Sequence, residues 1–568
     1  MGIINSLRNI VLSIVVFLSS VFFTYAEDIS DEFKLGQLIQ VELIKDDINK
    51  TIDIIKKYHI GSIIFYRQTN LKELIDLLNK LQEISLNNTG IPLLYAADFE
   101  TGVAYNVKEC ATVFPHQMGV AATGSVSLAE NIAKATAQES KSMGVYWNYS
   151  PIADVNTNPN NPVIGVRSFS DDPNIVSNFV KAYILGYQST DIIATAKHFP
   201  GHGNTDVDSH LNLPVINVDF NTLRNIYLKP FETAINSNVR SIMTAHIIVN
   251  AVDDTRPATF SEKILTDLLK KDMGYKGLVI TDALNMDAID EFYNINEVAI
   301  NALEAGANVL MATGSYEEQI QVLDGLFTAL KNNKIDRNLL NDSYNRVVKL
   351  KKNVGLFDNP TINYNEALKN CSSEKHKKLS QESFEKSLTT LVNNNIFPLK
   401  KQTTLYIAGQ YGAKELSQSF YKEGFKVYYT TMPNINNFTE GEINRLISSI
   451  DKYLIESDYF IFTTFSSEKP PLHKNQVLYA NLLKQYNKPL IVISLGLPYD
   501  IASLDFSDAF IATYALNRFI EPVTVNKMLY DVLVNAIKDL LIGKIKATGK
   551  LPVDIPGTMY KRGYNIYN

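Results

Sequence analysis

The stretch IIATAKHFPGHGNTDVDSH, residues 192–210, decides the fold predicted for this chain. Its first part, Ile192 to Ala196, is an apolar run typical of a buried strand, and Lys197 and His198 follow at the C-terminal end of that strand. Proline and glycine residues then break the strand, so residues 206–210 are expected on a loop above it. Loops held on a rigid scaffold often carry catalytic groups. The stretch therefore predicts an active site.

Short apolar runs alternate with amphipathic stretches across residues 35–355. The runs are Gly61–Tyr66, Pro92–Asp98, Val145–Asp154, Ile192–His198, Ser241–His246, Gly277–Asp282 and Ala307–Ala312, with one more possible near Leu35–Val41. This alternation implies parallel strands joined by crossover helices. With eight units it predicts a (β/α)8 barrel, assigned to residues 27–356.

Polar residues stand at or beside the ends of five predicted strands. They are Asp98, Asp154, Lys197 with His198, His246 and Asp282. In such barrels the C-terminal strand ends meet on one face, where the active site lies. A buried parallel strand has no structural need for a terminal Asp or His, so the coincidence points to a site.

The rest of the chain divides into a junction and a second domain. Residues 357–384 are polar and are predicted to be a linker that passes into a helix. A second alternation of apolar runs and helical segments fills residues 385–568 and predicts a smaller layered α/β sandwich domain. The expected fold class is therefore α/β, with a barrel followed by a sandwich.

The N-terminus has the layout of a secretory signal peptide, residues 1–26. Arg8 precedes an apolar run from Ile10 to Phe23, and small residues follow just before Glu27. The run is shorter than the roughly 20 apolar residues of a membrane span, which makes an uncleaved anchor the weaker interpretation. The mature protein is expected to be exported, to the periplasm or the medium, with no stable membrane span.

Composition narrows the function classes. A length of 568 residues, 45% apolar and 20% charged residues are ordinary for a globular protein of two or three domains. The net charge of −6 leaves no basic footprint, so nucleic acid is not an expected partner. Two cysteines are no disulfide scaffold: Cys110 and Cys371 either pair or remain two buried thiols.

Two groups have the chemistry of a hydrolytic site. A carboxylate at the end of an apolar strand, Asp282, is costly to bury, and it is either a nucleophile at the barrel mouth or a structural aspartate bonded to loop amides. Asp208 and His210 lie two residues apart, so the carboxylate can accept the imidazole N–H and raise the pKa of the ring. Such an imidazole donates a proton and later takes one back. The competing interpretation is a hydrogen bond that only stabilises the loop.

Further residues have the character of a binding site. Lys197, His198 and Arg167 are donors suited to sugar hydroxyls or a carboxylate, and Asp98 and Glu100 are acceptors after the second run. The histidines and aspartates of this region also have the side chains of a zinc site. Phe-Pro-Gly separates His198 from His202 and prevents the helical geometry of an i, i+4 ligand pair, so neither a metal nor a cofactor is predicted.

These residues resemble a known family. The run KHFPGHG followed by DSH, with a later TDAL, is similar to glycoside hydrolase family 3, specifically its β-N-acetylglucosaminidase branch of two-domain type. Further matches are ADFETG (97–102), IGVRSFSDDP (164–173), MTAHI (243–247), SLTTLVNNNIFPL (387–399), VISLGLPYD (492–500) and ATGKLPVDIP (547–556). The likeness covers nearly all of the mature chain.

The resemblance implies a role for each matching residue. Asp282 corresponds to the nucleophile of a retaining mechanism, and His210, held by Asp208, to the general acid and base. A further four residues correspond to the sugar-binding site: Asp98, Arg167, Lys197 and His198. The expected activity is release of terminal N-acetylglucosamine (GlcNAc) from peptidoglycan fragments or chitin oligosaccharides.

One departure from the family pattern and three competing functions accompany that expectation. Family members often read D-x-E-G-G-R-V where this chain has DFETGVA (98–104), which puts contacts to the leaving group in doubt. Histidine in place of a second carboxylate also leaves open a GlcNAc phosphorylase, in which phosphate replaces water. The second competing function is a β-glucosidase of the same family, and the third is an inactive sugar-binding homologue.

Overall fold

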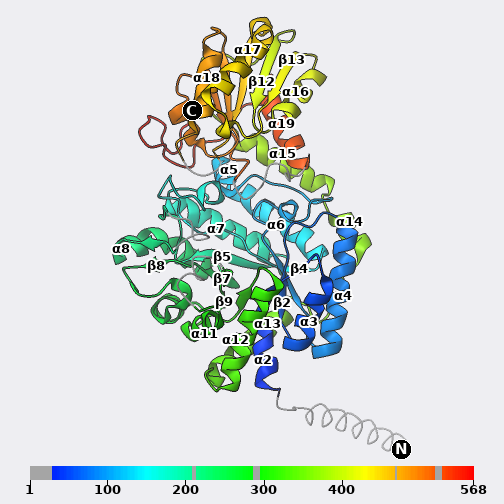
Figure 1. The fold of residues 1–568 in the computed structure, drawn as a ribbon. Coiled ribbons are helices and arrows are strands. Elements are labelled where there is room, and N and C mark those ends of the chain that lie inside the picture. Colours follow the sequence, from blue (N-terminus) through cyan, green and yellow to red (C-terminus); the bar gives the residue numbers. More distant parts are fainter. Residues whose placement is uncertain (1–28, 207–212, 286–293, 467–469, 518–526, 568) are drawn as a thin grey trace, which may run out of the picture.

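The computed structural model describes residues 29–206, 213–285, 294–466, 470–517 and 527–567. The chain forms a barrel, coloured blue to green in Figure 1, and a second layered unit, coloured yellow to red, that stands on one end of it. The proposed signal peptide, residues 1–26, lies outside the described residues. Within the described ranges, no helix combines the length and apolar character needed to cross a bilayer.

Eight parallel strands form the barrel, in the spatial order β10-β1-β2-β3-β4-β5-β7-β9. Their bounds are β1 (Ile39–Glu42), β2 (Ser62–Ile64), β3 (Leu94–Ala97), β4 (Val145–Asn148), β5 (Ile193–Phe199), β7 (Ser241–Thr244), β9 (Leu278–Ile280) and β10 (Leu310–Ala312). The ring closes between its first and last strands, where the N–H of Val309 donates to the Val279 carbonyl and the N–H of Thr281 donates to the Val309 carbonyl, each at 3.1 Å. The predicted barrel is confirmed.

Helices surround the barrel and cover the apolar outer faces of its strands (Figure 1). They are α2 (Asp31–Gln37), α3 (Ile48–Tyr58), α4 (Leu71–Thr89), α6 (Val126–Ser142), α7 (Pro173–Gln188), α9 (Lys229–Asn236), α11 (Ile295–Ala305), α12 (Tyr316–Lys331) and α13 (Arg337–Asn353), with the π-helices η3 (Leu223–Tyr227) and η5 (Lys263–Asp272). Local sequence sets their ends: Asp172 caps α7 by accepting the N–H groups of Asn174 and Ile175, and Pro173 opens the helix.

Short elements occupy the loops of the barrel. They are η1 (Val103–Tyr105), α5 (Gln117–Ala122), η2 (Gly165–Arg167), α8 (Phe220–Thr222), η4 (Ala258–Phe260) and the strand pair β6 (Val215–Ile216) and β8 (Ile248–Val249). The possible run near Leu35–Val41 is split, because α2 takes up its first residues and β1 begins at Ile39.

The junction between the two units holds α14 (Tyr364–Asn370) and α15 (Glu374–Ser387). These two helices occupy much of the stretch 357–384 expected to be a linker passing into a helix. α15 packs against α5 of the barrel and against α19 (Lys527–Leu541) of the second unit. The junction is therefore a packed connection between the units.

The second unit is a six-stranded sheet with the order β11-β16-β15-β14-β12-β13. Its strands are β11 (Thr389–Asn393), β12 (Thr404–Gly409), β13 (Lys426–Thr431), β14 (Tyr459–Thr464), β15 (Leu490–Ser494) and β16 (Ala509–Ala512). All neighbours are parallel except β11 with β16.

Helices cover both faces of this sheet. Alternate residues of β12 face opposite ways: Leu405 lies in the core shared with α16 (Ala413–Lys422) and α19, and Tyr406 lies in the core shared with α17 (Glu440–Glu456) and α18 (Lys474–Lys484). The short η6 (Ile435–Asn437) and η7 (Pro498–Ser503) complete the unit. The predicted α/β sandwich is confirmed.

Candidate active site

Three of the five predicted strand ends meet at one cavity; Asp154 and His246 do not line it. Asp98 follows β3, Lys197 and His198 lie near the end of β5, Asp282 follows β9, and Arg167 comes from η2. All five line a single cavity of about 590 Å³. The structure therefore brings together every described member of the predicted site.

Lys197 binds two carboxylates at the base of the cavity. Its Nζ lies 2.5 Å from Oδ1 of Asp98 and 3.0 Å from Oε1 of Glu100. Burial alone lowers the pKa of the lysine, but the two carboxylates outweigh burial and raise that pKa, so the ammonium stays charged. Asp98 is held in place by this contact, while 19% of its side chain remains exposed to a ligand.

Arg167 completes the network by a two-pronged bond to Glu100. Its Nε and Nη2 lie 3.0 Å and 2.8 Å from the two carboxylate oxygens. Burial raises the pKa of Glu100, yet the opposing effects of Arg167 and Lys197 are larger and bring it well below its usual range. Two cations and two carboxylates thus form a fixed polar wall, which suits recognition of sugar hydroxyls.

Asp154 orients His198. This fully buried carboxylate accepts the Nδ1 proton of His198 at 2.8 Å, the backbone N–H of His198, and the backbone N–H of His202 at 2.6 Å. The contact fixes the tautomer and leaves Nε2 of His198 as the ring atom available to a ligand. The sequence identified Asp154 only as a strand-end residue, and its contact with His198 was not predicted.

Asp282 lies in a turn that is itself anchored. Its Oδ1 accepts the N–H of Ala283 at 2.8 Å. The Nε2 of His246 lies 2.9 Å from the Ala283 carbonyl oxygen, and the Nδ1 of His246 lies 2.8 Å from the hydroxyl of Thr259. Because a carbonyl only accepts, His246 donates from Nε2, and this bond holds the turn that carries Asp282.

Several lining residues were not among the predicted site residues. They are Glu42, Tyr66, Arg67, Tyr105, Lys108, Tyr149 and His202. Glu42 ends β1 and follows the same strand-end pattern as Asp98, but the predicted run ends one residue earlier, at Val41. Burial is the main cause that raises the pKa of Glu42. The remaining residues become neighbours only through the tertiary fold.

The second unit supplies part of the cavity wall. Ala515, after β16, and Leu529, on α19, both line the cavity. Both side chains are apolar and buried. The second unit therefore helps shape the cavity.

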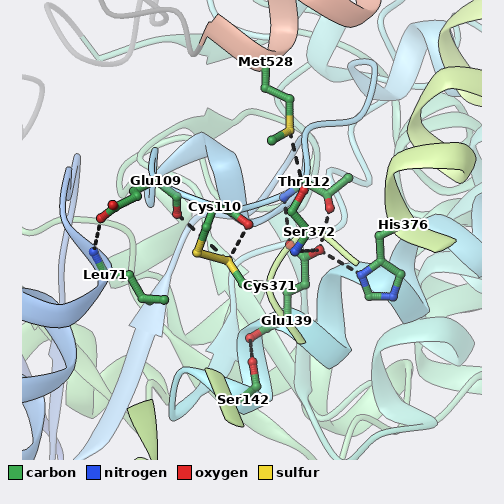
Figure 2. Close-up of a disulfide and its surroundings, with 10 residues drawn as sticks. All are labelled: Leu71, Glu109, Cys110, Thr112, Glu139, Ser142, Cys371, Ser372, His376 and Met528. Carbon is green, nitrogen blue, oxygen red and sulfur yellow. Dashed lines mark hydrogen bonds and ion pairs between the residues drawn. A yellow bond between two sulfur atoms is a disulfide. The ribbon is translucent and has the colours of Figure 1, made fainter. Parts of the chain in front are cut away.

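A disulfide holds the loop between β3 and α5, which provides much of the cavity lining. Figure 2 shows Cys110, on this loop, bonded to Cys371, which follows α14; their Cα atoms lie 5.6 Å apart. Beside it, the buried carboxylate of Glu139 accepts the N–H and hydroxyl of Thr112 at 2.9 Å and 2.5 Å, and the N–H of Ser372 at 3.0 Å. The sequence left open whether the two cysteines pair or remain free thiols, and in the structure they are paired.

The predicted acid/base pair, Asp208 and His210, lies outside the described residues. The chain is described up to Asp206, which is exposed, and the same loop begins at the buried residues His202 and Thr205. In the described part of the chain, no group of three or more His, Cys, Asp or Glu side chains is arranged as metal ligands.

Comparison with known proteins decides the family. Residues 31–350 match the family described as "Glycosyl hydrolase family 3 N terminal domain". This chain belongs to glycoside hydrolase family 3. It is 30% identical to "Beta-hexosaminidase A" of Pseudoalteromonas piscicida over 89% of this chain and 90% of that protein. It is 26% identical to the "Beta-N-acetylglucosaminidase/beta-glucosidase" of Cellulomonas fimi over 59% of each chain.

A solved structure supports the same placement within family 3. The family 3 β-N-acetylglucosaminidase from Paenibacillus sp. str. FPU-7 superimposes with a TM-score of 0.82 and 28% identity, over 93% of this chain and 99% of that one. The predicted resemblance to the β-N-acetylglucosaminidase branch is therefore confirmed. The chain is a glycoside hydrolase of two-domain type.

Proposed function

We propose that this protein is an exported, exo-acting, retaining β-N-acetylglucosaminidase. The main support is that Asp282 shares one cavity with the four predicted sugar-binding residues, Asp98, Arg167, Lys197 and His198. The names of the family 3 relatives add support for the hexosaminidase activity. The proposed substrates are glycans that end in GlcNAc, from peptidoglycan or chitin.

In the proposed mechanism the carboxylate of Asp282 attacks the anomeric carbon of the terminal sugar. The glycosidic bond breaks as the His210 imidazolium, steadied by Asp208, gives its proton to the leaving oxygen. A covalent glycosyl ester on Asp282 results. Neutral His210 then takes a proton from water, whose oxygen attacks the same carbon and releases both GlcNAc and Asp282. Two inversions give net retention.

The rest of the cavity holds the sugar for this attack. In this proposal Asp98 and Nε2 of His198 bind hydroxyls; the ion pair of Lys197 with Asp98 and the bond of His198 Nδ1 to Asp154 support these roles. An anchored turn keeps Asp282 in one orientation. A pre-formed site of this kind lowers the entropic cost of reaching the transition state.

Trapping tests the proposed nucleophile. A 2-deoxy-2-fluoro or 5-fluoro glycosyl donor forms a slow ester with a carboxylate nucleophile, and mass spectrometry of the digested protein locates the label. We expect the label on Asp282, and we expect Asp282→Asn to lower kcat at least about a thousandfold while sugar binding persists. A label on any other residue disproves the assignment.

Leaving-group dependence tests the acid/base pair. His210→Ala is expected to slow cleavage of chitobiose far more than cleavage of p-nitrophenyl GlcNAc, because the nitrophenolate leaves without a proton. Asp206→Asn, on the same loop, is the matched control and is expected to leave that ratio unchanged. Equal slowing of both substrates by His210→Ala contradicts the role.

The same assays separate the competing functions. A p-nitrophenyl sugar panel compares GlcNAc with glucose, the second activity named for the Cellulomonas fimi relative. Release of GlcNAc-1-phosphate that depends on added phosphate identifies a phosphorylase. Export is tested by N-terminal sequencing of protein from the medium or periplasm, which is expected to begin near Glu27.

A further inference from the structure

The strand β13 forms one edge of the sheet in the second unit. Within the described residues β13 pairs only with β12, in parallel, and it stands at one end of the spatial order of the sheet. Figure 1 shows it at an outer edge of the second unit, beside α16. An edge strand presents backbone donors and acceptors with which another strand can pair. This edge is therefore a candidate interaction surface.

The register of β13 on β12 shows which backbone groups face outward. Met432, directly after β13, donates its N–H to the Gly409 carbonyl of β12 at 3.0 Å. Because successive residues of a strand point their backbone groups in opposite directions, Val427, Tyr429 and Thr431 direct theirs away from β12. In the described part of the chain, the N–H and carbonyl groups of these three residues have no hydrogen-bond partner. They form a row of open donors and acceptors.

Exposed tyrosines flank this row on both faces of the sheet. Tyr429, within β13, is 49% exposed. On one face Tyr421 of α16 is 73% exposed. On the other face Tyr453 of α17 is 43% exposed, and its ring centroid lies 4.6 Å from that of Tyr428. Large apolar side chains gathered at an open edge are typical of a surface that binds a partner.

We propose that β13 pairs antiparallel with β13 of a second copy of this chain, so that the two sheets join into one. Two copies related by a two-fold axis present the same surface to each other. When the axis is perpendicular to the sheet, only side chains on the same face can lie opposite each other, and an axis through Tyr429 meets this condition. Tyr429 then exchanges both backbone hydrogen bonds with its own counterpart, and Val427 does the same with Thr431 of the second copy.

The charges of the strand are compatible with this pairing. Lys426 is the only charged residue of β13, stands at its first position and is paired with Glu456 at 3.2 Å. In the proposed register the two copies of Lys426 lie about 20 Å apart, at about 3.4 Å per residue, and salt screens repulsion over that distance. Edge strands that avoid pairing often carry proline or several charges, and β13 has no proline. No like charges therefore oppose each other along the strand.

The size of the surface predicts a weak dimer. At roughly 200 Å² for a whole tyrosine side chain, the exposed parts of Tyr421, Tyr429 and Tyr453 amount to about 300 Å² per copy. With the strand between them, the two copies bury on the order of 1,000 Å² in total, which is near the lower limit for a specific interface. The expected dissociation constant is therefore roughly micromolar.

Sedimentation equilibrium of the purified protein between about 1 and about 100 µM tests the dimer. Tyr429→Pro removes an outward-facing N–H and leaves the bonds to β12 in place, so it is expected to raise the dissociation constant at least about tenfold. Phe220→Pro is the matched control: Phe220 is an exposed aromatic residue of the barrel at the first position of α8, where proline is tolerated. A protein that stays monomeric at 100 µM, or a dimer that Tyr429→Pro leaves unchanged, overturns the proposal.

Cross-linking tests the register. Cys110 and Cys371 are the only cysteines and are bonded to each other, so one introduced thiol reports by itself. In Tyr429→Cys the two thiols meet at the proposed axis, where Cα atoms about 5.5 Å apart allow a disulfide, and mild oxidation is expected to link the copies. Tyr421→Cys, at a more exposed position away from the axis, is the control and is expected to remain largely monomeric. Equal cross-linking of both variants indicates random collision and overturns the proposal.

A glycan is the competing occupant of the tyrosine surface. Sedimentation of Asp282→Asn with and without chitotetraose separates the two, because a sugar stacked on the tyrosines displaces the second copy. We expect the dimer to persist, and its dissociation by chitotetraose overturns the proposal. The dimer is independent of the proposed function, since Tyr429 does not line the cavity. Tyr429→Pro is therefore expected to cleave p-nitrophenyl GlcNAc at the unmodified rate.

Discussion

The Nε2 atom of His246 lies 2.9 Å from the carbonyl oxygen of Ala283, the residue directly after Asp282. This bond joins the loop just after β7 to the turn after β9. His246 is buried, and its other ring nitrogen is bonded to Thr259. We interpret His246 as a positioning residue for the proposed nucleophile.

Removing the donor of this bond is expected to slow the chemistry and leave binding nearly intact. In His246→Leu the turn loses its anchor, and kcat for p-nitrophenyl GlcNAc is expected to fall about 10- to 100-fold with little change in KM. His246→Gln, which keeps a donor, is expected to recover part of the rate. A fall in thermal stability with unchanged kcat in the folded variant contradicts the positioning role.

Glu100 neutralises two buried cations, so its replacement by the uncharged glutamine is expected to lower stability. Glu100→Gln leaves Arg167 and Lys197 facing each other with one carboxylate fewer. We expect the free energy of unfolding to fall by about 3–5 kcal/mol, and KM to rise because Asp98 loses its fixed position. Urea unfolding and steady-state kinetics measure both effects. Asp76→Asn, in the exposed pair with Lys72, is the matched control and is expected to change little.

Buried histidines predict a loss of stability in mild acid. Burial is the main cause that lowers the pKa of His116 to about 4 and that of His202 to about 4. Between pH 6.5 and 4 the unfolded chain therefore binds more protons than the folded one, and stability falls as pH falls. Each histidine accounts for about 3 kcal/mol across this window.

Urea unfolding at pH 7 and pH 5 checks this slope. His116→Gln is expected to lessen the difference between the two pH values, and the remainder is assigned to His202. His116 also lies near Glu100 and Arg167, whose charges act on it in opposite directions. If the free energy of unfolding changes between pH 7 and pH 5 by the same amount in His116→Gln as in the unmodified protein, other groups cause the acid sensitivity.

The Cys110–Cys371 disulfide is expected to support both stability and substrate affinity. It spans 261 residues and ties the cavity-lining loop to the junction. The double change Cys110→Ser with Cys371→Ser is expected to lower the free energy of unfolding by about 2–5 kcal/mol and to raise KM. Treatment of the unmodified enzyme with reductant is expected to reproduce both shifts. Unaltered KM in the double variant means that Glu139 alone holds the loop.

The sequence was most informative where strand pattern and chemistry coincide. Asp98, Lys197, His198 and Asp282 follow apolar runs, and because parallel strands end on one face, their meeting in a cavity was predictable. Arg167 was different: the sequence offered it as a candidate donor and the family resemblance added it to the sugar site, but nothing local to η2 indicates that it binds Glu100.

Contacts between distant segments escaped prediction. The pairing of Cys110 with Cys371 requires that two loops come within 5.6 Å, which spacing alone does not determine. Arg67 and Lys108 become neighbours only because Gln68 pairs with Val107.

The wall residues Ala515 and Leu529 have a consequence for synthesis of the enzyme on the ribosome. A nascent chain whose barrel is finished at residue 356 still lacks both residues, which are added 159 and 173 positions later. Until then the cavity of the nascent protein lacks the part of its wall that these two residues supply. Full activity is expected to appear only when translation is nearly finished, after the last-made helix has docked.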